Sequence, residues 1–204
     1  MSSSLRTLVT QHAGDGRLEA IVLRPKRREP AVWGERVQIE PGRGVLGDHR
    51  SEKLRVGDEF LRREVTLIQA EHLPLLAAWA GRDSVDAREL RRNLVVGGIN
   101  LLALDSPFPG DRRLVRIGDQ VLLEVTGPCA PCSRMEAILG QGGYNAMRGH
   151  GGITARVIQG GWIQVGDSVR SLSEADALRK TVTVGEVPIL PLTPLSDGML
   201  HEPN

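Results

Sequence analysis

The amino-acid sequence predicts a mainly β fold, a β-barrel with a few short helices inserted, which makes it a β-rich α+β protein. Short runs of Val, Ile and Leu recur along the 204 residues, and 24 Gly and 12 Pro punctuate the chain. Aromatic residues make up only 3% of the chain, so the core depends on aliphatic side chains. The connections between the runs vary too much in length for a βαβ series, which favours a closed or nearly closed barrel.

Eight runs of aliphatic and β-branched residues predict strands. In chain order they are Leu18–Leu23, Val37–Ile39, Val65–Ile68, Asn93–Val96, Leu114–Ile117, Val121–Val125, Thr154–Gln159 and Ser168–Leu172. Pro25 and Pro41 follow the first two runs, and proline cannot donate a ladder hydrogen bond. A Gly-Asp pair precedes two others, at 118–119 and 166–167, and such pairs often begin β-hairpins.

Four segments predict short helices. Glu71–Ala80 places its apolar residues on one face and precedes Gly81, a suitable C-cap. Ser84 is a candidate N-cap for a helix that ends at Leu90. The other two helices are predicted over Cys132–Leu139 and Ser173–Lys180.

The domain organisation predicted from these elements is one domain over residues 1–172, with its core at 18–171, and a C-terminal extension over 173–204. Residues 181–190 are predicted as a terminal strand or arm. The four prolines from Pro188 onward indicate an extended tail.

Composition excludes several classes of protein. Lys and Arg number 26 against 25 Asp and Glu, a net charge of +1, which lacks the basic excess of a dedicated nucleic-acid binder. No run approaches the roughly 18 apolar residues of a membrane span, and residues 1–6 lack the pattern of a signal peptide. With only two cysteines, we expect a cytoplasmic, reduced protein with neither nucleic acid nor membrane as partner.

The two cysteines, Cys129 and Cys132, lie in a turn that connects a predicted strand to a predicted helix. Backbone N–H groups at the start of a helix favour an anion, and thus a thiolate that can act as nucleophile or metal ligand. Two buried, inert thiols are the structural alternative. Three chemical alternatives remain: a thioredoxin-like redox pair, a zinc site, and a reactive cysteine beside an anionic cofactor. In a thioredoxin-like protein the redox pair follows an early strand, whereas Cys129 and Cys132 stand late in this chain, after mostly β-patterned residues. A zinc site would need His150 and a distant ligand such as His49.

Glycine-rich and basic segments favour the third alternative. Residues 149–152, Gly-His-Gly-Gly, can direct backbone N–H groups toward an anion. Arginine pairs with phosphate through two N–H groups, and several arginines lie near this segment or before a predicted strand. A second glycine-rich loop spans residues 42–50 and carries two polar side chains, Asp48 and His49, that could take part in catalysis. The candidate residues are Arg92, Asn93, Arg134, Arg148, His150, Gly151 and Arg156 for the cofactor, and Asp48 and His49 for catalysis.

Together these segments resemble the MOSC family, named for the C-terminal domain of molybdenum cofactor sulfurases. The resemblance covers residues 18–171. Its segments are Gly44-Val45-Leu46-Gly47-Asp48-His49, Arg63-Glu64-Val65-Thr66-Leu67-Ile68, Arg92-Asn93-Leu94-Val95, Gly98-Ile99-Asn100-Leu101, Gly127 to Glu136, Gly149 to Arg156 and Gly160 to Val169. The chain is most similar to the stand-alone bacterial members.

The resemblance implies a barrel-like β fold and the molybdenum cofactor. The family cysteine corresponds to Cys132, the implied metal ligand and catalytic thiol, with Cys129 as a second thiol that some members share. Pyridoxal phosphate belongs to a fused sulfurase domain in the wider family and is not expected in this chain. A longer loop at residues 105–111 and the proline-rich tail depart from the family pattern.

Three functions are compatible with the resemblance. The first is an oxidoreductase that reduces N-hydroxylated compounds with an electron-donor protein. The second is a sulfur carrier in which Cys132 receives a persulfide from a cysteine desulfurase and Cys129 releases it. The third is a non-catalytic cofactor-binding module. A small-molecule substrate is expected, and the oligomeric state is left open, with a homodimer as one alternative.

Overall fold

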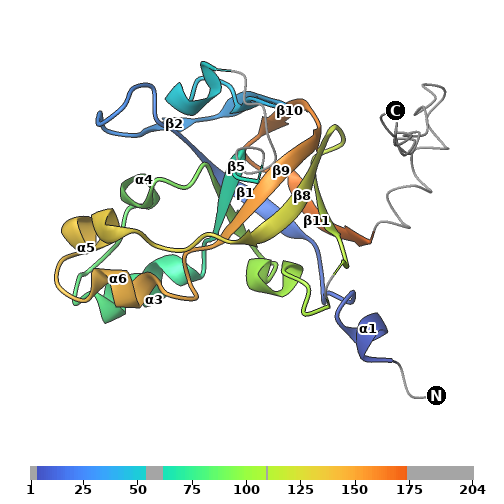
Figure 1. Cartoon of the computed structure of the whole chain (residues 1–204). Helices are drawn as coiled ribbons and strands as arrows, with labels where there is room; N and C mark the ends of the chain where they lie inside the picture. Colours follow the sequence, from blue (N-terminus) through green and yellow to red (C-terminus); the bar gives the residue numbers. More distant parts are fainter. Residues whose placement is uncertain (1–3, 54–61, 109, 174–204) are drawn as a thin grey trace, which may run out of the picture.

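The computed structural model describes residues 4–53, 62–108 and 110–173, and within them seven strands close into a barrel (Figure 1). Around the barrel the order is β1, β11, β7, β8, β9, β5, β6 and back to β1. Only β5 and β6 pair in parallel; the other pairs in the described chain are antiparallel. The predicted barrel is therefore confirmed.

The eight predicted strands all form. Their bounds are β1 Gly16–Leu23, β3 Arg36–Glu40, β5 Val65–Gln69, β6 Leu94–Gly97, β7 Arg113–Ile117, β8 Val121–Pro128, β9 Ile153–Gln159 and β11 Ser168–Ser173. Of the two Gly-Asp turns, Gly118-Asp119 joins the β7–β8 hairpin, as expected. Gly166-Asp167 instead connects strands of different sheets.

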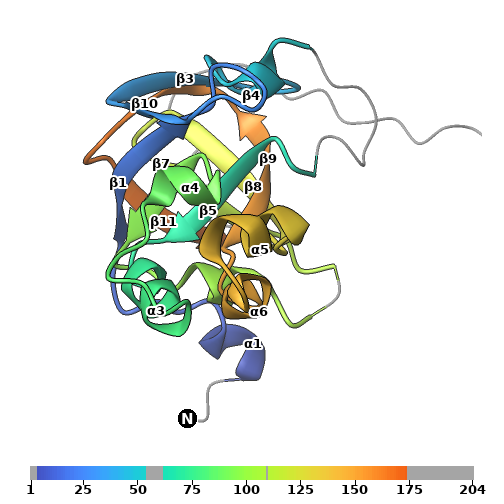
Figure 2. The same cartoon turned by 90° about the vertical axis from the view of Figure 1, so that its left-hand side faces the viewer.

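Three further strands were not predicted: β2 Val32–Gly34, β4 Gly44–Val45 and β10 Gly161–Gln164. Each has at most four residues and little apolar patterning, so tertiary pairing rather than local sequence forms it. β2 pairs with residues 21–23 of β1, on the edge whose residues 16–17 pair with β11. β10, β3 and β4 form a separate sheet at the upper end of the view in Figure 2.

The core has two layers because three barrel strands are covered on both faces. Along β6, Leu94 and Val96 point into the barrel, whereas Val95 packs outward against helices. Ile68 of β5 and Val22 of β1 join Val95 in this outer cluster. Leu94–Val96 of β6 and residues 20–23 of β1 are therefore continuous apolar runs rather than alternating ones, and Thr66 is the one polar residue within the run at 65–68 of β5.

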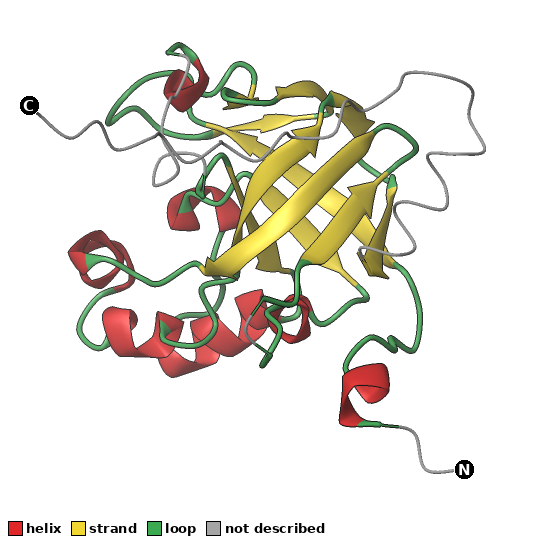
Figure 3. Cartoon of the chain, turned by 45° about the vertical axis from the view of Figure 1, so that its right-hand side comes forward, coloured by secondary structure: helices red, strands yellow, loops and turns green. Residues whose placement is uncertain are grey.

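Helices α3, α5 and α6 lie together on one side of the barrel (Figures 1 and 3). The helical segments are α1 Leu5–Leu8, α3 His72–Trp79, α4 Ala87–Leu90, α5 Ser133–Leu139, α6 Gly143–Met147 and the 3₁₀ turns η1 His49–Ser51 and η2 Leu101–Leu104. α1, α6 and both 3₁₀ turns were not predicted. Among the described helices, none is long and apolar enough to cross a membrane.

Two details of the predicted helices are corrected. The second helix begins after Asp86, not Ser84, because the Asp86 carboxylate accepts a hydrogen bond from the Arg88 N–H at 2.8 Å. Ser173 ends strand β11 and does not begin a helix. The rest of that predicted helix, the arm and the proline-rich tail lie outside the described residues.

Candidate functional site

The two cysteines occupy the turn between β8 and α5. Cys132 is the N-cap residue of α5 and its side chain is exposed. Cys129 is buried, and its backbone N–H donates to the Gly152 carbonyl at 2.8 Å. One thiol therefore faces solvent, while the other belongs to a turn that is bonded to the chain before β9.

Arg92 holds this turn in place. Its buried guanidinium donates to three backbone carbonyls: Leu90 at 2.8 Å, Gly151 at 2.9 Å and Cys129 at 3.2 Å. Burial lowers the pKa of Arg92, and the nearby thiols Cys129 and Cys132 oppose that shift. The predicted phosphate ligand thus serves as a clamp between the cysteine turn and the glycine-rich turn.

The glycine-rich turn has no room for side chains on its inner face. A Cβ on Gly151 would lie 2.2 Å from the Cys129 carbonyl oxygen. Gly152 has φ +84°, and a Cβ there would lie 1.9 Å from the Leu67 carbonyl oxygen. Both glycines allow close approach within the chain itself, and this packing sets the position of the cysteine turn.

A second buried network joins the ends of β1, the 42–50 loop and the start of β6. The Asp48 carboxylate accepts from Arg24 Nε at 2.5 Å and from Asn93 Nδ2 at 3.2 Å. Arg24 also donates to the Arg91 carbonyl at 3.1 Å. At the edge of the network His49 Nδ1 lies 3.0 Å from the Arg24 carbonyl. The structure thus brings together three predicted residues, Asp48, His49 and Asn93.

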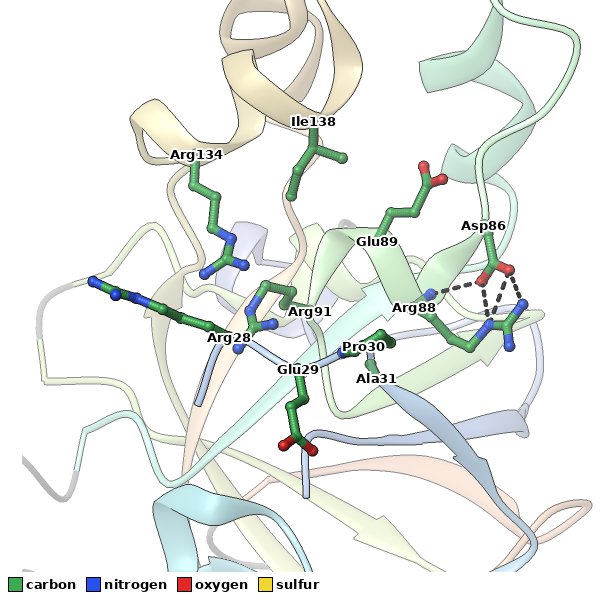
Figure 4. Close-up of a pocket in the computed structure, with 10 residues that line it drawn as sticks. All are labelled: Arg28, Glu29, Pro30, Ala31, Asp86, Arg88, Glu89, Arg91, Arg134 and Ile138. Atoms are coloured by element: carbon green, nitrogen blue, oxygen red, sulfur yellow. Dashed lines mark hydrogen bonds and ion pairs between the residues drawn. The ribbon is translucent and has the colours of Figure 1, made fainter. Parts of the chain in front are cut away.

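Next to this network lies a cavity of about 610 Å³ (Figure 4). Arg28, Arg91 and Arg134 line one end, and the Asp86–Arg88 ion pair lies at the other end. Within the described residues no carboxylate pairs with these three guanidinium groups, because the carboxylates of the cavity are paired elsewhere. Three uncompensated positive charges at one end of a cavity favour an anionic ligand.

The backbone at this cavity is strained. Arg28 has φ +70° and Arg91 has φ +60°, the two positive values among non-glycine residues of the described chain. Such conformations cost of order 1–3 kcal/mol each and gather at functional sites. Burial, followed by the charges of Arg134 and Arg24, lowers the pKa of Arg91, whereas Asp48 and Cys132 raise it. Arg91 is therefore within electrostatic reach of both the cysteine and the buried network.

Two predicted residues lie away from this cavity. Arg156 projects from the outer face of β9 and forms an ion pair with Glu124 of β8, which Arg112 also contacts at 2.7 Å. Burial would raise the pKa of Glu124, but the two arginines outweigh it and the pKa is lowered. Arg148 lines a different cavity, close to Cys129. The four arginines predicted for the cofactor thus lie in four different environments: Arg92 in the clamp, Arg134 at the larger cavity, Arg148 at the smaller one and Arg156 in an ion pair on β9.

His150 packs in an aromatic cluster with α3. Its ring centroid lies 4.8 Å from those of His72 and Trp79, in edge-to-face geometry. Burial, and then the charge of His150, lowers the pKa of His72; a backbone hydrogen bond to His150 and the Glu71 charge act in the opposite direction. This histidine is a packing residue between α3 and the glycine-rich turn.

Acidification is expected to destabilise the protein through His72. The folded pKa lies below the unfolded value of about 6.5, so the unfolded chain takes up the proton first. The contribution of neutral His72 is present above about pH 6.5 and is lost as the pH falls below it. Urea unfolding of wild type and His72→Gln between about pH 7.5 and 5.5 tests this. The variant should lose less stability across the range; equal losses would contradict the expectation. His12, whose pKa burial and Arg113 also lower, contributes equally to both proteins.

Sequence reasoning missed Arg24, Arg28 and Arg91 as members of the site. A signal was present in the basic run at residues 24–28, which stands in a predicted loop. Arg91 also precedes the two residues that were selected as candidates. In the part of the chain that the structure describes, no group of three or more His, Cys, Asp or Glu could hold a metal ion.

Comparisons with known proteins agree with this fold. Among curated proteins, none matches the chain in sequence. Among solved structures, the YuaD protein from Bacillus subtilis is similar with a TM-score of 0.65 and 17% identity, covering 78% of this chain and 97% of that one. YiiM from Geobacillus stearothermophilus gives a TM-score of 0.55, 20% identity and coverage of 78% and 75%. YiiM from Escherichia coli gives 0.52, 18%, and coverage of 78% and 70%.

These similarities extend over the barrel but, at such low identity, indicate the fold alone. The family model for the MOSC domain matches residues 51–170, more than half of the chain, and includes the cysteine turn, the Arg91–Asn93 segment and the glycine-rich turn. The chain therefore belongs to the MOSC domain family, which is associated with the molybdenum cofactor.

Proposed function

We propose that this protein binds the molybdenum cofactor, with the Cys132 thiolate as a ligand of the metal and Arg28, Arg91 and Arg134 as ligands of the cofactor's phosphate. The observation that carries the proposal is the exposed Cys132 thiol, which lies two residues from Arg134 and interacts electrostatically with Arg91. Together with Arg28, these two arginines line the cavity without carboxylate partners among the described residues. A thiolate is the soft ligand that such a metal favours. Guanidinium groups bind phosphate through charge-assisted hydrogen bonds.

The residues fit the cofactor in size and charge. A cavity of about 610 Å³ lies within the range of cofactor sites, and one end carries three uncompensated positive charges. Because the described residues include no cluster of His, Cys, Asp or Glu for a metal ion, the remaining ligands would come from the cofactor itself. The Arg92 clamp would hold the cysteine turn at a constant position relative to the arginines.

The reaction that we propose is the reduction of an N-hydroxylated compound to its amine and water, with two electrons from an external donor protein and two protons. The bound molybdenum would supply the redox centre. His49 is the residue that we propose for proton transfer, since its Nδ1 faces the Arg24 carbonyl and its Nε2 has no partner among the described residues. Asp48 would hold this segment in place through Arg24.

Metal analysis of the purified protein tests the cofactor proposal. Protein expressed in a host that makes the cofactor is expected to contain molybdenum, and Cys132→Ala is expected to lower its content by more than roughly tenfold, since it removes a direct ligand. Cys129→Ala, which removes the buried thiol of the same turn, is the matched control and should retain the metal. Wild-type protein without molybdenum, or full retention in Cys132→Ala, would overturn the proposal.

A second candidate function is sulfur transfer, favoured by an exposed and a buried thiol three residues apart in one turn. Cys132 would carry a persulfide received from a cysteine desulfurase. Attack of the Cys129 thiolate on the Cys132 sulfur would form a disulfide and release hydrosulfide as the leaving group. Mass spectrometry after incubation with a desulfurase and cysteine distinguishes the two functions, because an adduct on Cys132 supports carriage and its absence excludes it.

A further inference from the structure

A second cavity, of about 310 Å³, lies between the cysteine turn and the glycine-rich turn. It shares no lining residue with the cavity of the three arginines. Residues 128–131 form one wall, and Arg148, Gly149, Gly151 and Gly152 form part of the other. The Arg92 guanidinium bonds to both walls, at the Cys129 and Gly151 carbonyls, so the two walls are held together.

The walls of this cavity are suited to a flat apolar group. Pro128, Cys129 and Pro131 line one side, and Tyr144 from α6 is also a lining residue. Tyr144 is 41% exposed, so its side chain is accessible to a ligand. Its backbone N–H donates to the Glu136 carboxylate at 2.7 Å, which fixes its place at the start of α6. Proline and tyrosine rings provide the contacts that bind an aromatic ring.

The cavity has one charged lining residue, Arg148. Among the described residues its guanidinium makes a single long hydrogen bond, at 3.4 Å, to the Asn145 side chain. No Asp or Glu is among the residues that line the cavity. Arg148 is therefore available to a ligand anion, and it is separated from the three arginines that we propose for the cofactor's phosphate.

We infer that this cavity binds a small aromatic acid: one ring against Tyr144 and the two prolines, and one carboxylate on Arg148. A volume of about 310 Å³ is at the lower end of ligand pockets and suits a single ring with short substituents. The inference makes this cavity the site that binds the compound to be reduced, and in that respect it rests on the proposed function. It assigns Arg148 to the substrate rather than to the cofactor.

NMR titration of the purified protein with benzoate, and with benzamide as its neutral counterpart, tests the inference. Wild type is expected to bind benzoate more tightly than benzamide. Arg148→Gln should weaken benzoate binding by roughly tenfold and leave benzamide binding unchanged, because it removes one charge-assisted hydrogen bond. Tyr144→Ala should weaken both probes. Arg43→Gln, an exposed arginine between β3 and β4, is the matched control and should change neither.

Equal binding of benzoate and benzamide by wild type, or equal loss of both in Arg148→Gln, would overturn the inference. Tyr144 is the sole tyrosine of the chain, so shifts of its ring signals report directly on this cavity. Measuring molybdenum in the same samples separates the two proposals. Benzoate binding without molybdenum would remove the cofactor proposal and leave the cavity assignment standing, whereas molybdenum without benzoate binding would do the reverse.

Discussion

Replacing Arg92 by alanine is expected to lower the free energy of unfolding by about 3–5 kcal/mol. The substitution leaves the carbonyls of Leu90, Cys129 and Gly151 without their donor in a buried place. Each unsatisfied buried acceptor costs about 1–3 kcal/mol, and relaxation or entering water recovers part of the sum. Urea unfolding followed by circular dichroism measures the loss.

Two further variants serve as comparisons for the stability loss of Arg92→Ala. Arg88→Ala removes a neighbouring arginine that is exposed and whose partner Asp86 is partly exposed, so little change in stability is expected. Arg92→Lys keeps the charge but cannot span three carbonyls, and an intermediate loss is expected. A loss in Arg92→Ala no larger than in Arg88→Ala would show that the clamp does not stabilise the fold. The rate at which a thiol reagent modifies Cys132 in Arg92→Lys reports separately on the position of the turn.

Replacing Asp48 by alanine is expected to cost about 3–5 kcal/mol as well, because it leaves the buried Arg24 guanidinium without a counter-ion. The carboxylate also accepts from Asn93 Nδ2 at 3.2 Å and from the Arg50 N–H at 3.0 Å. Those donors lose their acceptor in the same substitution. The loss is measured by urea unfolding at neutral pH.

The double variant of Asp48→Ala with Arg24→Met separates the ion pair from the rest of the network. Removing both charges leaves no lone buried ion, so the double variant should lose clearly less stability than the sum of the two single variants. Strictly additive losses would mean that the pair is not coupled. Lys26→Met, two residues from Arg24 but largely exposed, is the surface control and should change stability little.

The barrel strands could be predicted because their apolar residues carry a local signal. Val65 to Ile68 and Leu94 to Val96 are covered on both faces, so their sequences are apolar runs, interrupted only by Thr66, that stand out from their polar neighbours. β2, β4 and β10 could not be found in this way, since their short segments become strands only by pairing with β1 or β3.

The site could be predicted in part. The place of Cys132 at the start of a helix follows from a strand, a turn and helical spacing, all of which are local. The role of Arg92 does not follow, because its three acceptors lie at residues 90, 129 and 151. Likewise Arg28 meets Arg91 and Arg134 only after the chain has closed the barrel.

By itself, the sequence determined that this is a β-rich domain with a cysteine turn before a helix and a glycine-rich turn, because periodicity, turn residues and helix starts are encoded within a few neighbouring positions. Only the tertiary structure decided which arginines are free. Arg92 and Arg156 are engaged with carbonyls or a carboxylate, whereas Arg28, Arg91, Arg134 and Arg148 face cavities. Whether a guanidinium is available to a ligand depends on the carbonyl and carboxylate acceptors that the fold brings to it from distant segments. Those acceptors cannot be predicted from any local pattern in the sequence.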